Sequence, residues 1–227
     1  MPYADHLVLR NVWVASFVLS LSLLGDALLY VILPVHADAF GVSLAMVGFL
    51  LAINRIIRTF TYGLIADLAE RIGLKKLCLI AATTAVLSTL GYTLLNGAVW
   101  LSLSRVMWGL SYAALLLITL SYAAINPQKT GTRIGLSRSV EQIGPLFAMT
   151  LGAWLATLVG PKAVFGYLAI VSGLAVLLAF FLFEKAQPEP IKRPARRDRL
   201  FSRPDRLDAL IFWMGAGIDG VFTLSIS

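Results

Sequence analysis

The sequence predicts an all-α integral membrane protein with several membrane-spanning helices. Hydrophobic residues make up 59% of its 227 residues and charged residues only 14%, which is more apolar surface than one soluble core can bury. The apolar residues form continuous runs of about 20 residues, the length that a helix needs to cross a hydrocarbon core of about 30 Å. Such runs lack the alternation of barrel strands, so the spans are expected to be helices.

Six runs are long enough to be spans, and a seventh apolar run begins at Ala209 and is cut off at Ser227. The first run is longer than the apolar part of a signal peptide and no cleavage site follows it, so it should remain as a membrane anchor. The predicted spans are residues 12–33, 44–66, 77–95, 99–125, 137–159 and 163–183.

The basic residues between the spans predict the orientation. Apart from Arg55, Arg58 and Arg105 within the spans, every Lys and Arg except Lys162 falls on the side of the N-terminus, and an excess of basic residues marks the cytoplasmic side. We therefore expect a multi-pass protein of the cell membrane (inner or plasma membrane) with a cytoplasmic N-terminus. The residues on that side are Arg10, Arg71, Lys75, Lys76, Lys129, Arg133, Arg138, Lys185, Lys192, Arg193, Arg196, Arg197, Arg199, Arg203 and Arg206.

Three regions are expected along the chain. Residues 1–183 form a six-helix transmembrane bundle, and residues 184–206, with four prolines and eight basic residues, form a cytoplasmic linker. Residues 207–227 form the truncated first helix of a second bundle. Residues 217–223 resemble residues 24–30, each with an aspartate at a similar depth, which suits a parallel repeat of six spans.

Composition argues against several kinds of site. The formal charge of +7 lies in short segments between apolar runs, where it encodes topology, so we expect lipid contact and no nucleic-acid groove. The single cysteine, Cys78, and the two histidines, His6 and His36, form no metal-binding cluster. No metal and no cofactor are expected.

Ionisable residues inside the spans are the candidate functional groups, because each costs several kcal/mol in hydrocarbon unless it has a partner or a wet cavity. The rise per residue places Asp26 and Arg105 at about the same depth. Tyr30 shares a helical face with Asp26, and Tyr112 shares one with Arg105, so these faces should line a central cavity. The five ionisable residues are Asp26, Arg55, Arg58, Arg105 and Glu141.

Each of these residues also has a plainer interpretation. Asp26 and Arg105 could form a structural ion pair that only sets helix register. Arg55 and Arg58 could extend toward the interface or cap backbone groups rather than line a cavity. Glu141 lies three residues after Arg138, and a local pair at the interface is the expected account of it.

The junction between spans 2 and 3 carries the residues Gly63, Asp67, Arg71, Gly73, Lys75 and Lys76. They resemble the signature loop of the major facilitator superfamily, except that three additional residues separate Asp67 from the basic part. The resemblance implies a latch on the cytoplasmic side that holds one conformation of a rocking bundle. The plain alternative is that the basic residues only anchor topology.

Two more motifs resemble those of this family. Arg105 and Gly109 match an Arg, three residues, Gly pattern that the resemblance associates with proton coupling. Gly144 and Pro145 resemble in part the span-5 motif of drug:proton antiporters, although Val140 and Met149 stand where that motif has glycine. Otherwise Gly144 and Pro145 are simply a helix-5 hinge.

The resemblance implies a secondary transporter, or its N-terminal half, that moves a small molecule by alternating access. Proton-coupled efflux of apolar cations or drugs is the first expectation, with Asp26 as the proton or cation-substrate site and Arg105 as its counter-ion. The alternatives are an uptake symporter for a sugar or an organic anion, which two span-2 arginines favour, and a non-transporting half-carrier that acts as an assembly partner. An enzyme is not expected, because neither histidine lies within a span.

Overall fold

A computed structural model describes residues 5–183 of the chain, and the predicted linker and seventh span lie outside the described residues. Within this part every regular element is a helix, which confirms the predicted all-α fold class. The elements are α1 (Asp5–Val35), η1 (Ala37–Phe40), α2 (Leu44–Ile72), α3 (Leu74–Leu94), α4 (Ala98–Ala123), η2 (Pro127–Lys129), α5 (Thr130–Glu141), α6 (Ile143–Phe147), the π-helical segment η3 (Ala148–Gly152), α7 (Ala153–Val159) and α8 (Ala163–Ala179).

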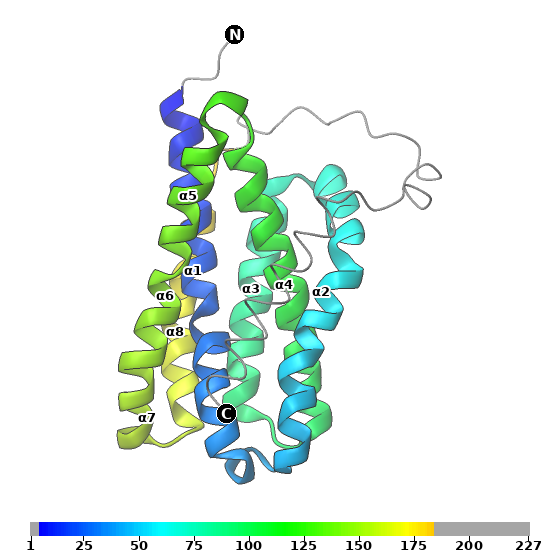
Figure 1. The fold of residues 1–227 in the computed structure, drawn as a ribbon, viewed down its shortest axis with the longest axis vertical. Helices are drawn as coiled ribbons and strands as arrows, with labels where there is room; N and C mark the ends of the chain where they lie inside the picture. The colour runs from blue at the N-terminus through cyan, green and yellow to red at the C-terminus, as the bar shows by residue number, and fades with distance from the viewer. Residues whose placement is uncertain (1–4, 184–227) are drawn as a thin grey trace. The chain divides into compact units, whose positions relative to one another are not determined.

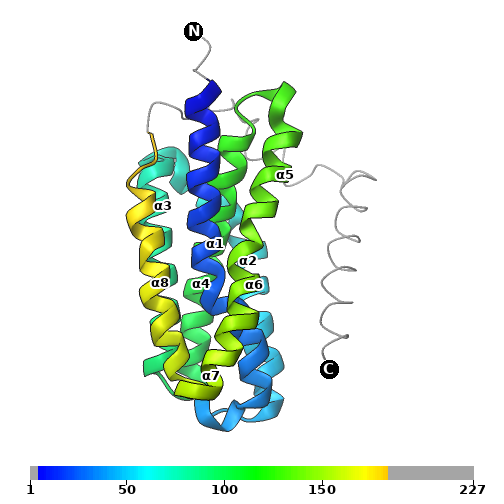
Figure 2. The same cartoon turned by 90° about the vertical axis from the view of Figure 1, so that its left-hand side faces the viewer.

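The long helices lie side by side in one bundle (Figures 1 and 2), with α1 among the others. Helix α1 packs against α4, α5 and α8, while α4 also packs against α2 and α3. Most of the α1 span is buried by these neighbours, whereas only 17% of the α2 span and 22% of the span from Pro127 to Val159 are buried. Therefore α2 and the segmented helix α5–α7 are the ones whose side chains face out of this bundle.

In the described part of the chain, five helical stretches are long and apolar enough to cross a membrane. They cover the first five predicted spans but extend beyond several of the apolar runs, since α1 begins at Asp5 and α2 continues to Ile72. The sixth predicted span, 163–183, is helical over Ala163–Ala179. That helix is about 25 Å long at 1.5 Å per residue, slightly short of the usual span length.

The junction between α2 and α3 is a break at one residue, Gly73, rather than an extended loop. Good helix formers after Gly63, including Leu, Ala, Glu and Arg, continue α2 through Asp67 and Arg71. Gly73 then adopts φ +85, a left-handed backbone region that favours glycine, and its N–H donates to the Ala69 carbonyl (3.0 Å). The signature residues up to Arg71 are therefore helical in this structure.

The fifth predicted span is broken into segments. Helix α5 ends at Glu141, and Pro145 lies in the short α6, which a π-helical turn follows. Proline lacks an N–H and disturbs the helical ladder, so the irregular stretch falls where Gly144 and Pro145 predict a hinge. Gly144 lies directly against α1, where its N–H donates to the Ser20 hydroxyl (2.8 Å) and a Cβ would overlap the Ser20 carbonyl.

The start of α1 and the end of α8 lie at the same end of the bundle. The Asn11 side chain donates to the Phe183 carbonyl (3.1 Å) and accepts from the Phe183 N–H (3.2 Å). At this end Asp5 forms ion pairs with Lys129 and Arg133. At the opposite end, Lys162 donates to the Leu95 carbonyl (3.1 Å). The described chain thus crosses the bundle an even number of times.

Candidate functional site

The centre of the candidate site is an ion pair between Asp26 of α1 and Arg105 of α4. The Arg105 Nη1 atom contacts the Asp26 Oδ1 atom directly. The Arg105 side chain is fully buried, whereas the Asp26 side chain keeps 11% of its exposure. Asp26 and Arg105, which the sequence places at about the same depth, are therefore in direct contact, and the arginine is the more deeply enclosed of the two.

Arg105 is also fixed by the backbone of α2. Its Nε atom donates to the Leu50 carbonyl (3.0 Å) and its Nη2 atom to the Leu51 carbonyl (3.3 Å). Gly109 makes this approach possible, because a Cβ at that position would lie only 2.9 Å from the Asn54 carbonyl oxygen. The Arg-x-x-x-Gly pattern thus has a structural reason, since the glycine brings α2 within reach of the arginine one turn away.

Asn54 is a member of the site that the sequence analysis missed. It is fully buried on α2, and its Nδ2 atom donates to the Asp26 Oδ1 atom (3.3 Å). Its own Oδ1 atom is buried without a hydrogen-bond partner among the described residues. An uncharged amide inside an apolar run gives little signal in sequence, and only its position one residue before Arg55 could have drawn attention to it.

Tyr30 and Arg55 extend the cluster outward from the ion pair. Tyr30 accepts a hydrogen bond from the Arg105 Nη2 atom (3.2 Å) and donates to the Leu51 carbonyl (3.3 Å). The Arg55 guanidinium lies 5.8 Å from the centre of the Tyr30 ring, within the range of a cation–π contact. Both side chains are half-buried, so this edge of the cluster opens to the outside of the bundle.

Arg58 and Tyr112 belong to a second cluster, which also contains Glu141 and Arg138. The Arg58 guanidinium lies 4.4 Å from the centre of the Tyr112 ring. The Tyr112 hydroxyl donates to the Glu141 Oε1 atom (3.3 Å), and Arg138 donates to Glu141 Oε2 (2.7 Å). The expected local pair between Arg138 and Glu141 is present, but the buried carboxylate also contacts α4, a link that the break after α5 concealed from sequence reasoning.

The predicted latch residues do not join these clusters. Gly63, Asp67 and Arg71 lie on the last turns of α2, with Asp67 and Arg71 exposed and one helical turn apart. Gly73 forms the break, and Lys75 and Lys76 lie in the first turn of α3. A Cβ at Gly63 would meet nothing within 4 Å, so this glycine does not mark a close helix contact within the bundle.

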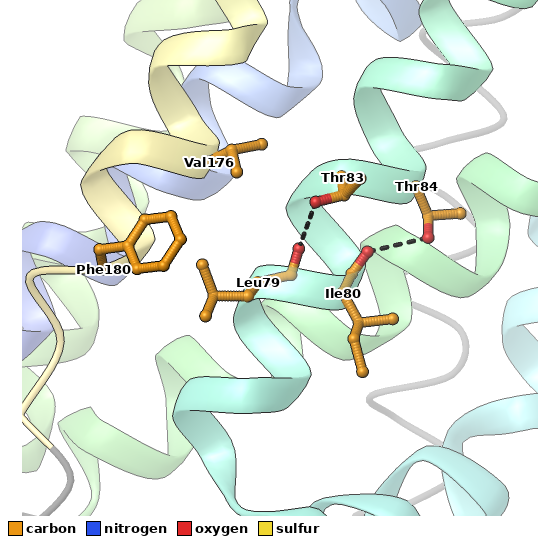
Figure 3. Close-up of a pocket in the computed structure, with 6 residues that line it drawn as sticks. All are labelled: Leu79, Ile80, Thr83, Thr84, Val176 and Phe180. Carbon is orange, nitrogen blue, oxygen red and sulfur yellow. Dashed lines mark hydrogen bonds between the residues drawn. The ribbon is translucent and has the colours of Figure 1, made fainter.

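A surface pocket between α3 and α8 contains none of the candidate residues (Figure 3). The hydroxyls of Thr83 and Thr84 donate to the carbonyls of Leu79 and Ile80 (2.8 Å each), as the dashed lines show. No charged side chain lines this pocket. It therefore offers an apolar surface to lipid rather than a binding site for a polar solute.

A bundle of apolar helices long enough to cross a membrane, with ion pairs enclosed between them, defines an integral membrane protein. A family model described as Major Facilitator Superfamily matches residues 15–226, and the chain therefore belongs to this superfamily. This family is known for transporters rather than enzymes. The expected membership is thereby confirmed, and the chain is a multi-pass membrane protein.

The chain is also similar to an uncharacterized MFS-type transporter, YbcL, of Bacillus subtilis (strain 168). The two sequences are 22% identical over 215 residues, which are 91% of this chain and 55% of the relative. The chain thus spans about half the length of the relative that it matches.

Proposed function

We propose that the full-length protein is a proton-coupled secondary transporter that exports a small molecule by alternating access. The observation that carries this proposal is the buried Asp26–Arg105 pair, in which a carboxylate contacts a fully enclosed arginine between two spanning helices. A buried ion pair adds little net stability, because desolvation of two charges offsets much of their attraction, so a pair at this depth is a candidate for a functional role. The plainer interpretation is a pair that only sets helix register, and the experiment below distinguishes the two.

In the proposed mechanism Asp26 carries the proton. Protonation removes its negative charge and weakens its attraction to Arg105. Arg105 would keep its hydrogen bonds to the Leu50 and Leu51 carbonyls of α2. Asn54 suits both forms of the carboxyl group. Its amide N–H donates to the carboxylate, and its unpartnered Oδ1 atom could accept from a protonated carboxyl after rotation of the amide. Proton binding would thereby loosen α1 from α4 and favour the alternate conformation.

The remaining parts of the proposal concern architecture. A second six-helix bundle would complete the cavity, and the N-terminus would face the cytoplasm, as the basic end of the bundle supports. Asp67, Arg71, Lys75 and Lys76 would form the cytoplasmic latch, and Gly144 and Pro145 the hinge. Export is the proposed direction because Gly144 and Pro145 resemble in part the span-5 motif of drug:proton antiporters.

The test is transport by the full-length protein in proteoliposomes with an imposed pH gradient. Exported substrate is first identified by comparing the solutes released by cells with and without the protein. Asp26→Asn should abolish the response to the pH gradient but leave exchange without a gradient measurable, because the amide keeps the size of the carboxyl group and cannot carry the proton. Asp38→Asn, in the segment η1, is the matched control with the same charge change. Unchanged coupling in Asp26→Asn would remove this residue from the mechanism.

A further inference from the structure

Two arginines of α2 have no acidic partner in the described part of the chain. Asp26 is paired with Arg105 and Glu141 with Arg138, while Arg55 and Arg58 make no ion pair. Each instead lies against the ring of a tyrosine. The two clusters together therefore contain four guanidinium groups and two carboxylates, which leaves an excess of two positive charges.

These two charges lie on a helix that is poorly covered by its own bundle. Only 17% of the α2 span is buried, and both Arg55 and Arg58 are half-buried. An unpaired guanidinium costs several kcal/mol in contact with hydrocarbon, so this face is suited to a wet cavity and not to lipid. In a membrane the excess charge calls for an anion that comes from outside this bundle.

The two arginines are held in the same way. Arg55 lies against Tyr30, whose hydroxyl contacts the Asp26–Arg105 pair, and Arg58 lies against Tyr112, whose hydroxyl contacts Glu141. Their positions differ by three residues, so they lie on neighbouring turns of one face, about 4.5 Å apart along the axis. The tyrosine rings restrict both side chains, and each guanidinium carries five N–H donors in a fixed planar arrangement.

We propose that Arg55 and Arg58 bind the transported substrate and that this substrate is a small organic dianion, such as a dicarboxylate or a phosphate monoester. Guanidinium groups bind both anions through paired hydrogen bonds, and two groups one turn apart match two negative charges. The charge balance thus favours an anion over the apolar cation that aromatic residues alone suggest. The statement that this ligand is the transported molecule rests on the proposed function. The proposed binding site does not depend on that function.

The experiment measures binding without any gradient. The full-length protein in detergent, at fixed pH and constant ionic strength, is unfolded by heat in the presence of succinate, inorganic phosphate or tetraphenylphosphonium. Both dianions should raise the unfolding temperature, and the cation should not. In the double variant Arg55→Gln, Arg58→Gln the apparent affinity for dianions should fall by about tenfold for each arginine removed.

Three further variants make the result specific. Lys129→Gln removes an exposed cation outside the clusters and should leave dianion binding unchanged. Replacement of Arg55 and Arg58 by Lys should give intermediate affinity, because lysine keeps the charge and loses the planar fork. Asp38→Asn, which changes an exposed acid of η1, should also leave dianion binding unchanged. Binding is measured without a gradient, so failure of this proposal is distinguishable from failure of proton coupling.

Each opposite outcome overturns the proposal. These outcomes are no stabilisation by either dianion, stabilisation by the cation, or dianion binding that survives in the double variant.

Discussion

Replacement of Arg105 by methionine removes the cation of the buried pair and leaves the Asp26 carboxylate in place. Arg105 is fully buried, and its hydrogen bonds reach Asp26, Tyr30 and the Leu50 and Leu51 carbonyls. Loss of one partner from a buried pair typically costs about 3–5 kcal/mol, because the other charge stays uncompensated. The double variant Asp26→Asn, Arg105→Met removes both charges and should recover about 2 kcal/mol or more of that loss.

The assay is the free energy of unfolding of the full-length protein in mixed detergent micelles, for the wild type, both single variants and the double variant. The four values give the coupling energy between Asp26 and Arg105. A cost below about 1 kcal/mol with no coupling would refute the reasoning, because that is the behaviour of an exposed pair.

Two other predictions concern glycines at close contacts between helices. In each case the free energy of unfolding is measured. Gly173→Ala is the control, because a Cβ at Gly173 would meet nothing within 4 Å. Gly109→Ala should destabilise the bundle by about 1–3 kcal/mol and weaken transport, because its Cβ would crowd the Asn54 backbone between α4 and α2. Gly144→Ala should cost at least as much, because its Cβ would overlap the Ser20 carbonyl of α1. An effect of Gly109→Ala or Gly144→Ala no larger than that of the control would show that these glycines are not contact positions.

Much of the fold and the centre of the site follow from sequence. Apolar runs locate the helices because their length is set by the bilayer, and the constant rise of a helix is enough to place Asp26 level with Arg105. Asn54 and the Leu50 and Leu51 carbonyls could not be predicted, since they join the site only through the close approach of α2 to α4 at Gly109. Helix rotation and tilt depend on such tertiary contacts, which one sequence does not encode in a local pattern.

The bond between Glu141 and Tyr112 escaped prediction for a related reason. The three-residue spacing of Arg138 and Glu141 already accounts for Glu141 as a local ion pair, so the sequence gives no indication of a second partner for the glutamate. The glutamate reaches α4 from the last residue of α5, immediately before the chain departs from regular α-helix. Departures of this kind, at Pro145 and the π-helical turn, change which face of a helix looks inward.

The two hydrogen bonds between Asn11 and Phe183 have a mechanical consequence. They fasten the last described residue of the bundle to the first helix by both its N–H and its carbonyl. Asn11 lies about 22 Å along α1 from Asp26 at the rise of a helix. A displacement of the chain at Phe183 would therefore be transmitted to α1, the helix that holds the proposed proton site.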